Sequence, residues 1–316
     1  MKKNLSKNQK GSSETIRETF ISLKKKRKLN NNDLDHGKNL FHFEQYLQFE
    51  ITQQKPNHLF LEWFIGFFEA DGSFCHWFDG KRNRFNIEIN QKDPKLMYKI
   101  KKNLGFGSVI QFQRNNQIYW RYTTTRLSHI KKFILLFNGN LITEHKNEQF
   151  SKFLNKFNEN YNESIMELNS KRLISLNNAW LSGFLEGDGG FFAMQRKLLN
   201  KKKLNSGLII KFYVTQKQEI LLLQQIKNLF EISTKLSQIH NGNQLQKYNR
   251  LETSNVTSLK LIKNYLQRYP FLGQKQIVIK RWIRLIDYKI KDYPMTPKST
   301  KKLKQLIFST KQSFCN

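Results

Sequence analysis

Two short segments of the chain end in the same way: in Glu, a small residue, Asp and Gly. WFIGFFEADGSF spans 63–74 and WLSGFLEGDGGF spans 180–191, so the second segment starts 117 residues after the first. The apolar part of each segment predicts a buried helix that ends at the acids. Because the C-terminal end of a helix carries partial negative charge, an acid there is unfavourable. A chain that places acids there twice, in matching context, is expected to use them in chemistry.

Small residues recur at helical spacing in both segments: Gly66 and Ala70 in the first, Gly183 and Gly187 in the second. Residues four apart lie on one face of a helix, and small side chains there let two helix backbones approach closely. We therefore expect the two helices to pack side by side with their ends together. This packing would bring Asp71 and Asp188 to the end of one shared seam, each before a glycine suited to ending a helix.

Paired acids at such a seam predict a metal site. Two adjacent carboxylates repel, so one of them is pushed toward its neutral form, and a divalent cation removes this penalty. Oxygen ligands of this kind favour Mg²⁺, or Mn²⁺ as a similar hard ion. The expected metal ligands are the side chains of Asp71 and Asp188 with the helix-end carbonyls of Ala70 and Gly187. Beside a phosphodiester, such a metal lowers the pKa of a water and stabilises the leaving oxygen; the alternative is two solvated acids that only cap their helices.

The elements around the two segments repeat in the same order, which predicts an α+β fold. Apolar periodicity and turn residues indicate helix, hairpin, helix, hairpin and helices in each half. The expected ranges of the first half are 59–70, 73–78 with 84–91, 94–104, 107–113 with 118–125, 127–137 and 141–157. Those of the second half are 179–187, 190–197 with 207–217, 219–230, 235–240 with 245–254, 256–267 and 274–291. An internal repeat of this kind is the main architectural feature of the chain.

Composition divides the chain into five parts. Residues 1–57 are polar and basic and predict a flexible arm, which is also a candidate for nucleic-acid contact. The first repeat spans 58–157, a linker spans 158–178 and the second repeat spans 179–292. Residues 293–316 include TPKSTKKLKQ and predict a basic, mobile tail.

The charge of the chain favours a polyanionic partner. Lys and Arg number 55 against 24 Asp and Glu, a formal net charge of +31, which suggests nucleic acid first and an anionic membrane second. A generally lysine-rich composition is the alternative source of this excess. No apolar run reaches the roughly 18 residues of a membrane-spanning helix, and the first residues lack the apolar core of a secretory signal. The two cysteines, Cys75 and Cys315, and the seven histidines predict neither a disulfide framework nor a metal site built from Cys or His.

Alternation within the predicted strands indicates sheets with one buried and one polar face. In RFNIEINQ at 84–91 and LIIKFYVTQ at 208–216, apolar residues alternate with polar ones. A solvated face is the alternative for any single strand, but four such hairpins on a chain of this charge favour DNA. The candidate DNA-binding residues on these two strands are Arg84, Asn86, Glu88, Lys211 and Tyr213.

FIGFFEADG at 64–72 and LSGFLEGDG at 181–189 resemble the nine-residue signature of the LAGLIDADG homing endonuclease family. Glu69 and Glu186 stand in place of the first acid of the signature, and the second, metal-binding acid falls on Asp71 and Asp188. The resemblance covers about 58–292. It implies a single-chain pseudo-dimer of two αββαββα halves, with the motif helices packed at the centre and both antiparallel sheets forming a saddle over DNA.

The resemblance also implies residues that assist the two acids. The family often carries Gln at the end of the second strand, near the metals, where Gln91 and Gln216 stand. A Lys near the start of the late helix helps to order water around the scissile phosphate, and Lys146 and Lys275 match this place. A solvated Lys is the alternative, because Lys is abundant in this chain.

Equivalent places in the fourth strand of each half hold Arg121 and Arg250. Both suit contact with phosphate or guanine, and the alternative is an inward ion pair. The halves also differ: 28 residues separate Asp from Gln in the second half and 20 in the first, because the second half includes RKLLNKKKLNSG. This difference predicts two half-sites that are read differently.

Three functions remain open. The first is an intron-encoded, Mg²⁺-dependent endodeoxyribonuclease that cuts both strands of a long DNA site and leaves 3′ overhangs. The second is an RNA maturase that assists splicing of a group I intron on the same fold; the presence of both acids favours the nuclease and leaves dual activity open. The third is a DNA-binding regulator without catalytic activity, against which the intact acids argue.

The expected partner is double-stranded DNA, with host intron RNA as an alternative and no membrane. We expect a monomer in an organelle, a mitochondrion ahead of a plastid, because of the AT-rich composition and the habit of the family.

Overall fold

Two halves with the same order of elements follow one another along the chain. The structure, a computed structural model, describes residues 41–49, 55–169, 173–196, 207–240, 247–291 and 296–312. The first half contains α2 (Glu44–Gln48), α3 (His58–Asp71), β1 (Gly72–Phe78), β2 (Asn83–Gln91), α4 (Pro94–Leu104), β3 (Ser108–Arg114), β4 (Gln117–Thr124), α5 (Leu127–Phe137) and α6 (Glu144–Tyr161). The second contains α7 (Trp180–Asp188), β5 (Gly189–Gln195), β6 (Leu208–Gln216), α8 (Ile220–Leu229), β7 (Ser237–His240), β8 (Lys247–Thr253), α9 (Val256–Arg268), α10 (Lys275–Ile290) and α11 (Pro297–Gln312). Apart from α2 and α11, these elements agree with the expected ones to within a few residues.

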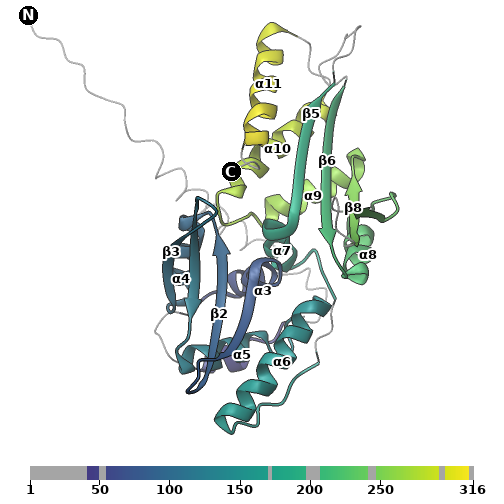
Figure 1. The fold of residues 1–316 in the computed structure, drawn as a ribbon. Helices are drawn as coiled ribbons and strands as arrows, with labels where there is room; N and C mark the ends of the chain where they lie inside the picture. Colours follow the sequence, from purple (N-terminus) through teal and green to yellow (C-terminus); the bar gives the residue numbers. More distant parts are fainter. Residues whose placement is uncertain are drawn as a thin grey trace, which may run out of the picture. The chain divides into compact units, whose positions relative to one another are not determined.

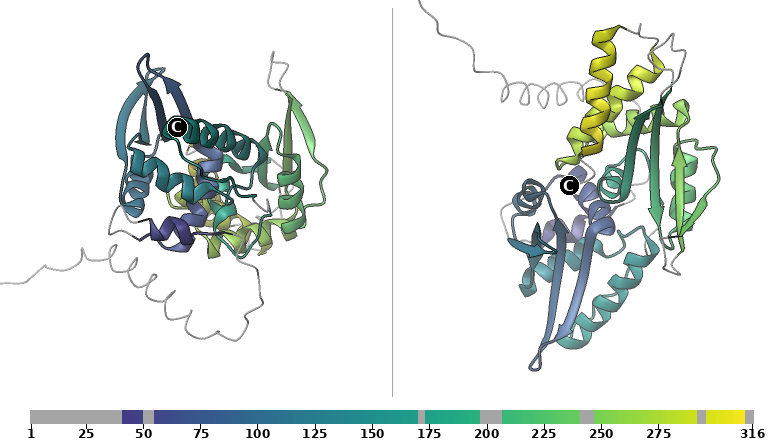
Figure 2. Two further views of the ribbon diagram at one scale, coloured as in Figure 1. Left: turned by 90° about the horizontal axis from the view of Figure 1, so that it is seen from below. Right: turned by 45° about the horizontal axis from the view of Figure 1, so that its top comes forward.

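Each half has one four-stranded antiparallel sheet with the same strand order. That order is β1-β2-β4-β3 in the first half and β5-β6-β8-β7 in the second. Gly72 pairs with Ile89 and its counterpart Gly189 pairs with Val214, so the register is repeated as well. The predicted α+β fold of two pseudo-symmetric αββαββα halves is confirmed, and α3 and α7 lie between the two sheets (Figure 1, Figure 2).

Local signals place the elements around the site. The side chain of Asn57 caps α3 by accepting a hydrogen bond from the Phe60 N–H over 2.7 Å. The turn between β3 and β4 uses Asn115 and Asn116 with φ of 49° and 57°, the left-handed conformation that a two-residue hairpin turn requires. The expected turn at Asn241-Gly242 and most of the insertion, residues 197–206, lie outside the described residues.

The helix α3 is buried on every side and is apolar from Phe60 to Phe68 except at Glu62. Each residue from Phe60 to Glu69 is buried, because both halves cover the helix. A helix that is apolar all round belongs in the interior of a protein. Among the helices that the structure describes, none is long and apolar enough to cross a membrane.

The expectation of a flexible arm over 1–57 is wrong for its last part. The short helix α2 packs against α5, and the segment buries Phe41, Phe43 and Tyr46. Lys132 of α5 lies with its ammonium 4.8 Å from the centre of the Tyr46 ring, a cation–π contact. A few aromatic anchors within a polar sequence are therefore enough to fix this segment. Residues 1–40 lie outside the part of the chain that the structure describes.

The expectation of a mobile tail over 293–316 is also wrong in part. Helix α11 packs against α10 and β5, and buries Leu303 and Ile307. These two residues stand four apart and share one helix face, a weak signal within a lysine-rich sequence. In addition, α6 continues to Tyr161 and so extends into the expected linker.

Candidate active site

The two motif helices pack with backbone against backbone. A Cβ atom added at Gly66 would lie 2.0 Å from the carbonyl oxygen of Trp180, and one added at Gly183 would lie 1.9 Å from that of Trp63. Any side chain at either position would therefore separate the helices. At the end of the seam, a Cβ atom at Gly187 would lie 2.3 Å from the Cβ of Ala70. The predicted close packing of the small residues is confirmed.

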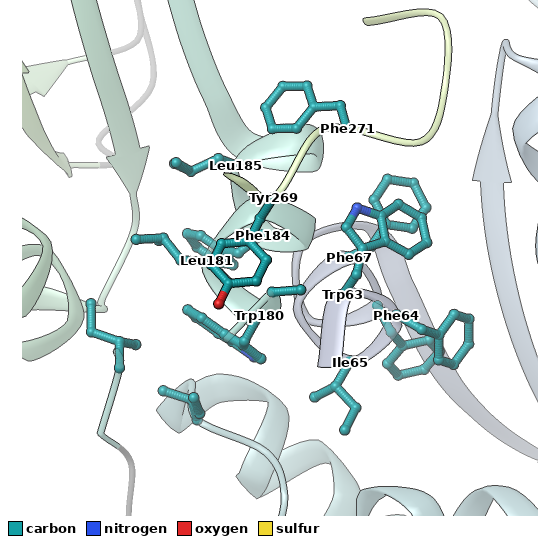
Figure 3. Close-up of a cluster of buried hydrophobic side chains, with 14 of the residues drawn as sticks. Trp63, Phe64, Ile65, Phe67, Trp180, Leu181, Phe184, Leu185, Tyr269 and Phe271 are labelled. Carbon is teal, nitrogen blue, oxygen red and sulfur yellow. The ribbon is translucent and has the colours of Figure 1, made fainter. Parts of the chain in front are cut away.

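Aromatic side chains surround this seam in matching pairs (Figure 3). The rings of Trp63 and Phe67 stack at 4.9 Å on α3, and those of Trp180 and Phe184 stack at 5.1 Å on α7. Such pairs add about 0.5–1.5 kcal/mol beyond their buried area. The seam is therefore a rigid base for the residues at its end.

Asp71 and Asp188 are the last residues of α3 and α7 and lie at the same end of the seam. A Cβ atom at Gly187 would lie 2.8 Å from the Oδ2 atom of Asp71, which places this carboxylate against the end of α7. The following glycines are not left-handed caps: Gly72 has φ −85° and Gly189 has φ −74°. Their role is spatial, because a Cβ atom at Gly72 would lie 2.2 Å from the ring of Phe68.

Each aspartate is held by the glutamine that the sequence singled out. The Nε2 of Gln91 donates to Oδ2 of Asp71 over 2.6 Å, and the Nε2 of Gln216 donates to Oδ2 of Asp188 over 2.7 Å. Both glutamines continue the buried parity of their strands, β2 and β6. The last residue of each strand therefore directs its polar side chain to the end of the seam.

Burial sets the protonation of the two aspartates. Desolvation, and to a lesser extent the charge of Asp188, raise the pKa of Asp71 to about 7 against the opposing effects of Lys275, Gln91 and Lys146. The pKa of Asp188 is also raised, mainly by desolvation. The sequence predicted one acid pushed toward neutrality by repulsion; the structure adds that loss of water contributes more than the second charge.

Two lysines, of which Lys146 is buried and Lys275 is partly exposed, lie behind the aspartates. The Nζ of Lys146 donates to the carbonyl of Gly72 over 2.6 Å, and the Nζ of Lys275 donates to the equivalent carbonyl of Gly189 over 2.8 Å. Burial lowers the pKa of both ammonium groups, and the nearby acids oppose this shift. Lys146 therefore repeats the place of Lys275, and neither is the solvated lysine of the alternative interpretation.

The two lysines differ in their further contacts. Lys146 also donates to Oε1 of Gln149 over 3.0 Å. Lys275 instead donates to further carbonyls at the end of α7, those of Leu185, Glu186 and Gly187 at 3.4, 2.9 and 3.3 Å. The carbonyl of Gly187, an expected metal ligand, thus already accepts from an ammonium group. Its role as a ligand, like that of the Ala70 carbonyl, stays a prediction.

The two glutamates of the motifs, Glu69 and Glu186, have a structural role that the sequence did not predict. Glu69 accepts hydrogen bonds from the N–H groups of Ile142 and Thr143, both over 2.7 Å, and Glu186 accepts from those of Leu272 and Gly273 over 2.8 and 2.7 Å. These N–H groups directly precede the helices that carry the two lysines. Burial raises the pKa of Glu69 and of Glu186 to about 7 in each case.

Both glutamates also accept from a tryptophan of the opposite motif helix, Glu69 from Trp180 and Glu186 from Trp63. The sequence contained the signal, since both quoted segments begin with Trp. It did not reveal that the bond crosses the seam.

The polar face of the first sheet carries a connected network. Glu88 accepts from Asn86 over 2.9 Å and from Asn90 over 3.1 Å, and it pairs with Arg121 at 3.2 Å. Arg121 also donates to Oδ1 of Asn90 over 2.8 Å and lies 4.8 Å from the ring of Phe112. Arg121 therefore forms an ion pair in the protein alone, but on the polar face, with 37% of its side chain exposed, rather than inward.

The second sheet repeats this arrangement with different residues. Glu252 pairs with Lys211 at 2.8 Å and with Arg250 at 3.7 Å. The guanidinium of Arg250 lies 4.0 Å from the centre of the Tyr213 ring, close enough for a cation–π contact. Each sheet thus has one glutamate that pairs with basic side chains on its polar face: Glu88 with Arg121, and Glu252 with Lys211 and Arg250.

The remaining candidate DNA-binding residues lie in different settings. Arg84 pairs with Asp79 at the tip of the first hairpin. Asn86 is only 7% exposed and accepts from Thr123 Oγ1 over 2.6 Å. Contact of any of these residues with DNA stays a prediction.

Comparison with known proteins agrees with this geometry. The family model described as LAGLIDADG endonuclease matches residues 64–157 and 181–286. A "Probable intron-encoded endonuclease 4" of Neurospora crassa is 32% identical over 224 residues, which cover 71% of this chain and 39% of that protein. A "Probable intron-encoded endonuclease Cox1-I1b" of Schizosaccharomyces pombe is 26% identical over 255 residues, 71% of this chain and 63% of that protein. The chain therefore spans less than two thirds of the length of either relative.

Two further similarities concern the alternative function and the fold. An "Intron-encoded RNA maturase bI4" of Saccharomyces cerevisiae is 29% identical over 133 residues, 41% of this chain and 19% of that protein. The crystal structure of the I-LtrWI LAGLIDADG homing endonuclease bound to target DNA shares the fold with a TM-score of 0.60, at 17% identity and over 79% of this chain and 97% of that one. With two complete motifs, a matching family model and this fold, the chain belongs to the LAGLIDADG endonuclease family.

Proposed function

We propose that this chain is a site-specific DNA endonuclease that hydrolyses phosphodiesters with Mg²⁺ or Mn²⁺ bound between its two halves. The observation that carries the proposal is the pair of carboxylates, Asp71 and Asp188, at adjoining helix ends, each with a lysine bound to the carbonyl of the next residue. Membership of the family supports nuclease chemistry, and the charge of +31 supports a nucleic-acid partner.

The residues at the seam suit a hard divalent cation. Burial raises the pKa of both aspartates even though Lys146 and Lys275 lie nearby, so these lysines do not offset the cost of desolvating the carboxylates. A cation held by Asp71, Asp188 and carbonyl oxygens of the helix ends would lower that cost. When bound, it supplies positive charge beside the phosphate and acidifies a water.

The side chains of the protein have complementary tasks. Gln91 and Gln216 each donate to one oxygen of an aspartate and so fix the orientation of that carboxylate. The ammonium groups of Lys146 and Lys275 would neutralise charge that develops on the phosphate and order the attacking water. Because the site contains two such sets, one from each half, it is suited to cut both strands. The 3′ overhangs are what membership of the family implies.

The polar faces of the two sheets are the proposed DNA-binding surface, arranged as a saddle. Arg121, Lys211 and Arg250 bring cations to these faces, and their carboxylate partners keep them in place. Phosphates would compete for these cations, so affinity would fall steeply with salt.

Cleavage of DNA that spans the intron-free allele of the host gene tests the proposal. With Mg²⁺, the protein should make one double-strand cut, whereas Asp71→Asn and Asp188→Asn should bind the same DNA and fail to make that cut. Glu159→Gln is a matched control, because Glu159 lies exposed on α6 and pairs only with Lys156 among its described ion pairs. If wild type, like the active-site variants, left the DNA uncut with Mg²⁺ and with Mn²⁺, the proposal would be contradicted.

The alternative function is an intron RNA maturase, which the similarity to a maturase over 133 residues favours for part of the chain. If this function holds, splicing of the intron RNA would not depend on the cleavage chemistry of the two aspartates. Promotion of splicing by the double variant Asp71→Asn with Asp188→Asn, equal to that by wild type, would support it.

The fold of two fused halves further supports a monomer, and a relative named for a cox1 intron supports an organelle, the mitochondrion ahead of the plastid.

A further inference from the structure

We infer that Asp93 and Glu219 are positioning residues, each of which holds the first turn of the helix that carries the lysine of the opposite half. The inference rests on the proposed function, because it assigns each residue a role in cutting one DNA strand. It follows from two sets of hydrogen bonds that repeat between the halves.

Asp93 connects the first half to the lysine of the second half. Its Oδ1 caps α4 by accepting from the N–H groups of Lys95 and Leu96 over 3.0 and 3.2 Å. Its Oδ2 accepts from the N–H of Gln274 over 2.6 Å. Gln274 directly precedes Lys275, the first residue of α10. One carboxylate therefore divides its two oxygens between the two halves.

Glu219 makes the reciprocal connection. Its Oε2 accepts from the N–H of Glu144 over 3.1 Å and its Oε1 accepts from that of His145 over 2.8 Å. His145 directly precedes Lys146. Glu219 is buried, with 7% exposed, and it does not cap its own helix, α8. The whole carboxylate is therefore committed to the opposite half.

The helices that carry the two lysines, α6 and α10, are here called the lysine helices. The N–H groups at the start of each one donate to two acids, one from each half. In the first half, residues 142 and 143 donate to Glu69 and residues 144 and 145 donate to Glu219. In the second half, residues 272 and 273 donate to Glu186 and residue 274 donates to Asp93. The N–H groups at a helix start lack partners within the helix and carry partial positive charge. Carboxylates from both halves satisfy these groups, which fixes the helix start relative to both.

These contacts join the aspartate of one half to the lysine of the other by a few residues of chain. Asp93 stands two positions after Gln91, which binds Asp71. Glu219 stands three positions after Gln216, which binds Asp188. A shift of either strand end would therefore move a glutamine that holds one aspartate and an acid that holds the opposite lysine helix. Catalysis is sensitive to displacements of this kind, since about 1 Å can cost about 100-fold in rate.

The alternative is that both acids only hold the two halves together. If the acids only hold the halves together, loss of either residue should change the cleavage rates of both DNA strands alike. Positioning predicts that the two losses act on opposite strands, because Asp93 serves Lys275 and Glu219 serves Lys146. Strand-resolved cleavage separates these outcomes.

The experiment uses Asp93→Asn and Glu219→Gln in the full chain, with target DNA labelled differently on its two strands. Each substitution keeps side-chain size and removes the negative charge; in Asp93→Asn one oxygen remains for the cap of α4. We expect each variant to slow one strand roughly 10- to 100-fold and to accumulate nicked DNA, with the nick on opposite strands in the two variants. Glu219→Asp, which keeps the charge, should recover part of the rate, and Glu159→Gln should cut both strands like wild type. Equal slowing of both strands, slowing of the same strand by both variants, or no slowing would overturn the inference.

Hydrogen–deuterium exchange provides a measurement that does not depend on cleavage. In Asp93→Asn, amides at 271–276 should exchange faster while those at 142–147 stay as in wild type, and Glu219→Gln should show the reverse. If wild type fails to cut DNA, the proposed function fails, and the exchange pattern still decides the inference. Equal changes at both helix starts, or none, would overturn it.

Discussion

The indole of Trp63 on α3 donates a hydrogen bond over 3.0 Å to the buried carboxylate of Glu186 on α7. Trp180 and Glu69 form the counterpart of this bond in the opposite direction. Each bond crosses the seam and ends on an acid that also holds the loop before a lysine helix. The second acid of each motif lies where the proposed chemistry occurs, while the first acid ties the seam to the groups around it.

Replacement of Trp63 by Phe should therefore destabilise the protein. The substitution keeps an aromatic ring in the seam but leaves the buried Glu186 without one of its donors, which costs about 1–3 kcal/mol. Urea unfolding at neutral pH measures the free energy of unfolding. Trp77→Phe is the matched control, because Trp77 is 45% exposed and should change stability little. Equal effects of the two substitutions would show that the bond across the seam adds no stability.

Gly183→Ala should be more severe. Its Cβ would lie 1.9 Å from the carbonyl oxygen of Trp63, and this oxygen belongs to a helix backbone that cannot move alone. The helices would have to separate, so we expect a loss above about 3 kcal/mol or failure to fold. Asn155→Ala, on the exposed side of α6, is the control and should be neutral or slightly stabilising. Thermal unfolding of both variants checks this, and a mild effect of Gly183→Ala would mean that the helices are not in backbone contact.

The fold could be predicted from the sequence because the same signals occur twice. Each hairpin has alternating strands, and the small residues at 66, 70, 183 and 187 fix which helix faces meet. The paired aspartates follow from that packing, whereas the glutamines came from the resemblance to the family, with which their strand parity agrees.

Contacts between residues far apart in sequence could not be predicted in the same way. Asp93 and Glu219 look like ordinary residues at the start of a helix, and only the fold brings them to residues 274 and 145. The order of α2 and α11 depends on a few apolar residues whose burial outweighs their basic surroundings, Tyr46 and Leu303 among them. Composition averages over such residues and therefore indicates a flexible arm and tail.

Asp71→Asn should stabilise the metal-free protein at high pH. Burial and the charge of Asp188 raise the pKa of Asp71 to about 7 in the folded protein, against about 4 for an unfolded Asp. The folded state thus favours the neutral form, and the charged form is unfavourable above pH 7. This penalty decreases as the pH falls through about 7 and is absent below about 4. The variant carries no charge here, so its advantage should be about 2–4 kcal/mol at pH 8.5 and should decrease steadily as the pH falls from about 7 toward about 4.

Thermal unfolding of wild type and Asp71→Asn from pH 5 to pH 8.5 without divalent metal tests this. The difference between the two proteins is the relevant quantity, because the other titrating groups contribute to both. Mg²⁺ should then raise the melting temperature of wild type at pH 8.5 and have little effect on the variant, since a ligand stabilises only the form that binds it. A pH-independent difference would mean that Asp71 is not the group that titrates near pH 7.

Glu252→Gln should strengthen general DNA binding while it reduces discrimination between sequences. Glu252 pairs with both Lys211 and Arg250 on the open face of the second sheet. Its neutralisation frees two cations for phosphates, so the slope of log affinity against log salt should become steeper by about 1–2. Fluorescence anisotropy with target and unrelated duplexes between about 50 and about 300 mM salt, a range of about sixfold, measures both effects. Glu163→Gln breaks a similar ion pair with Lys131, which lies on helix α5 and not on a strand, and should leave the slope unchanged. If Glu252→Gln also leaves it unchanged, the open face of the second sheet does not contact the DNA backbone.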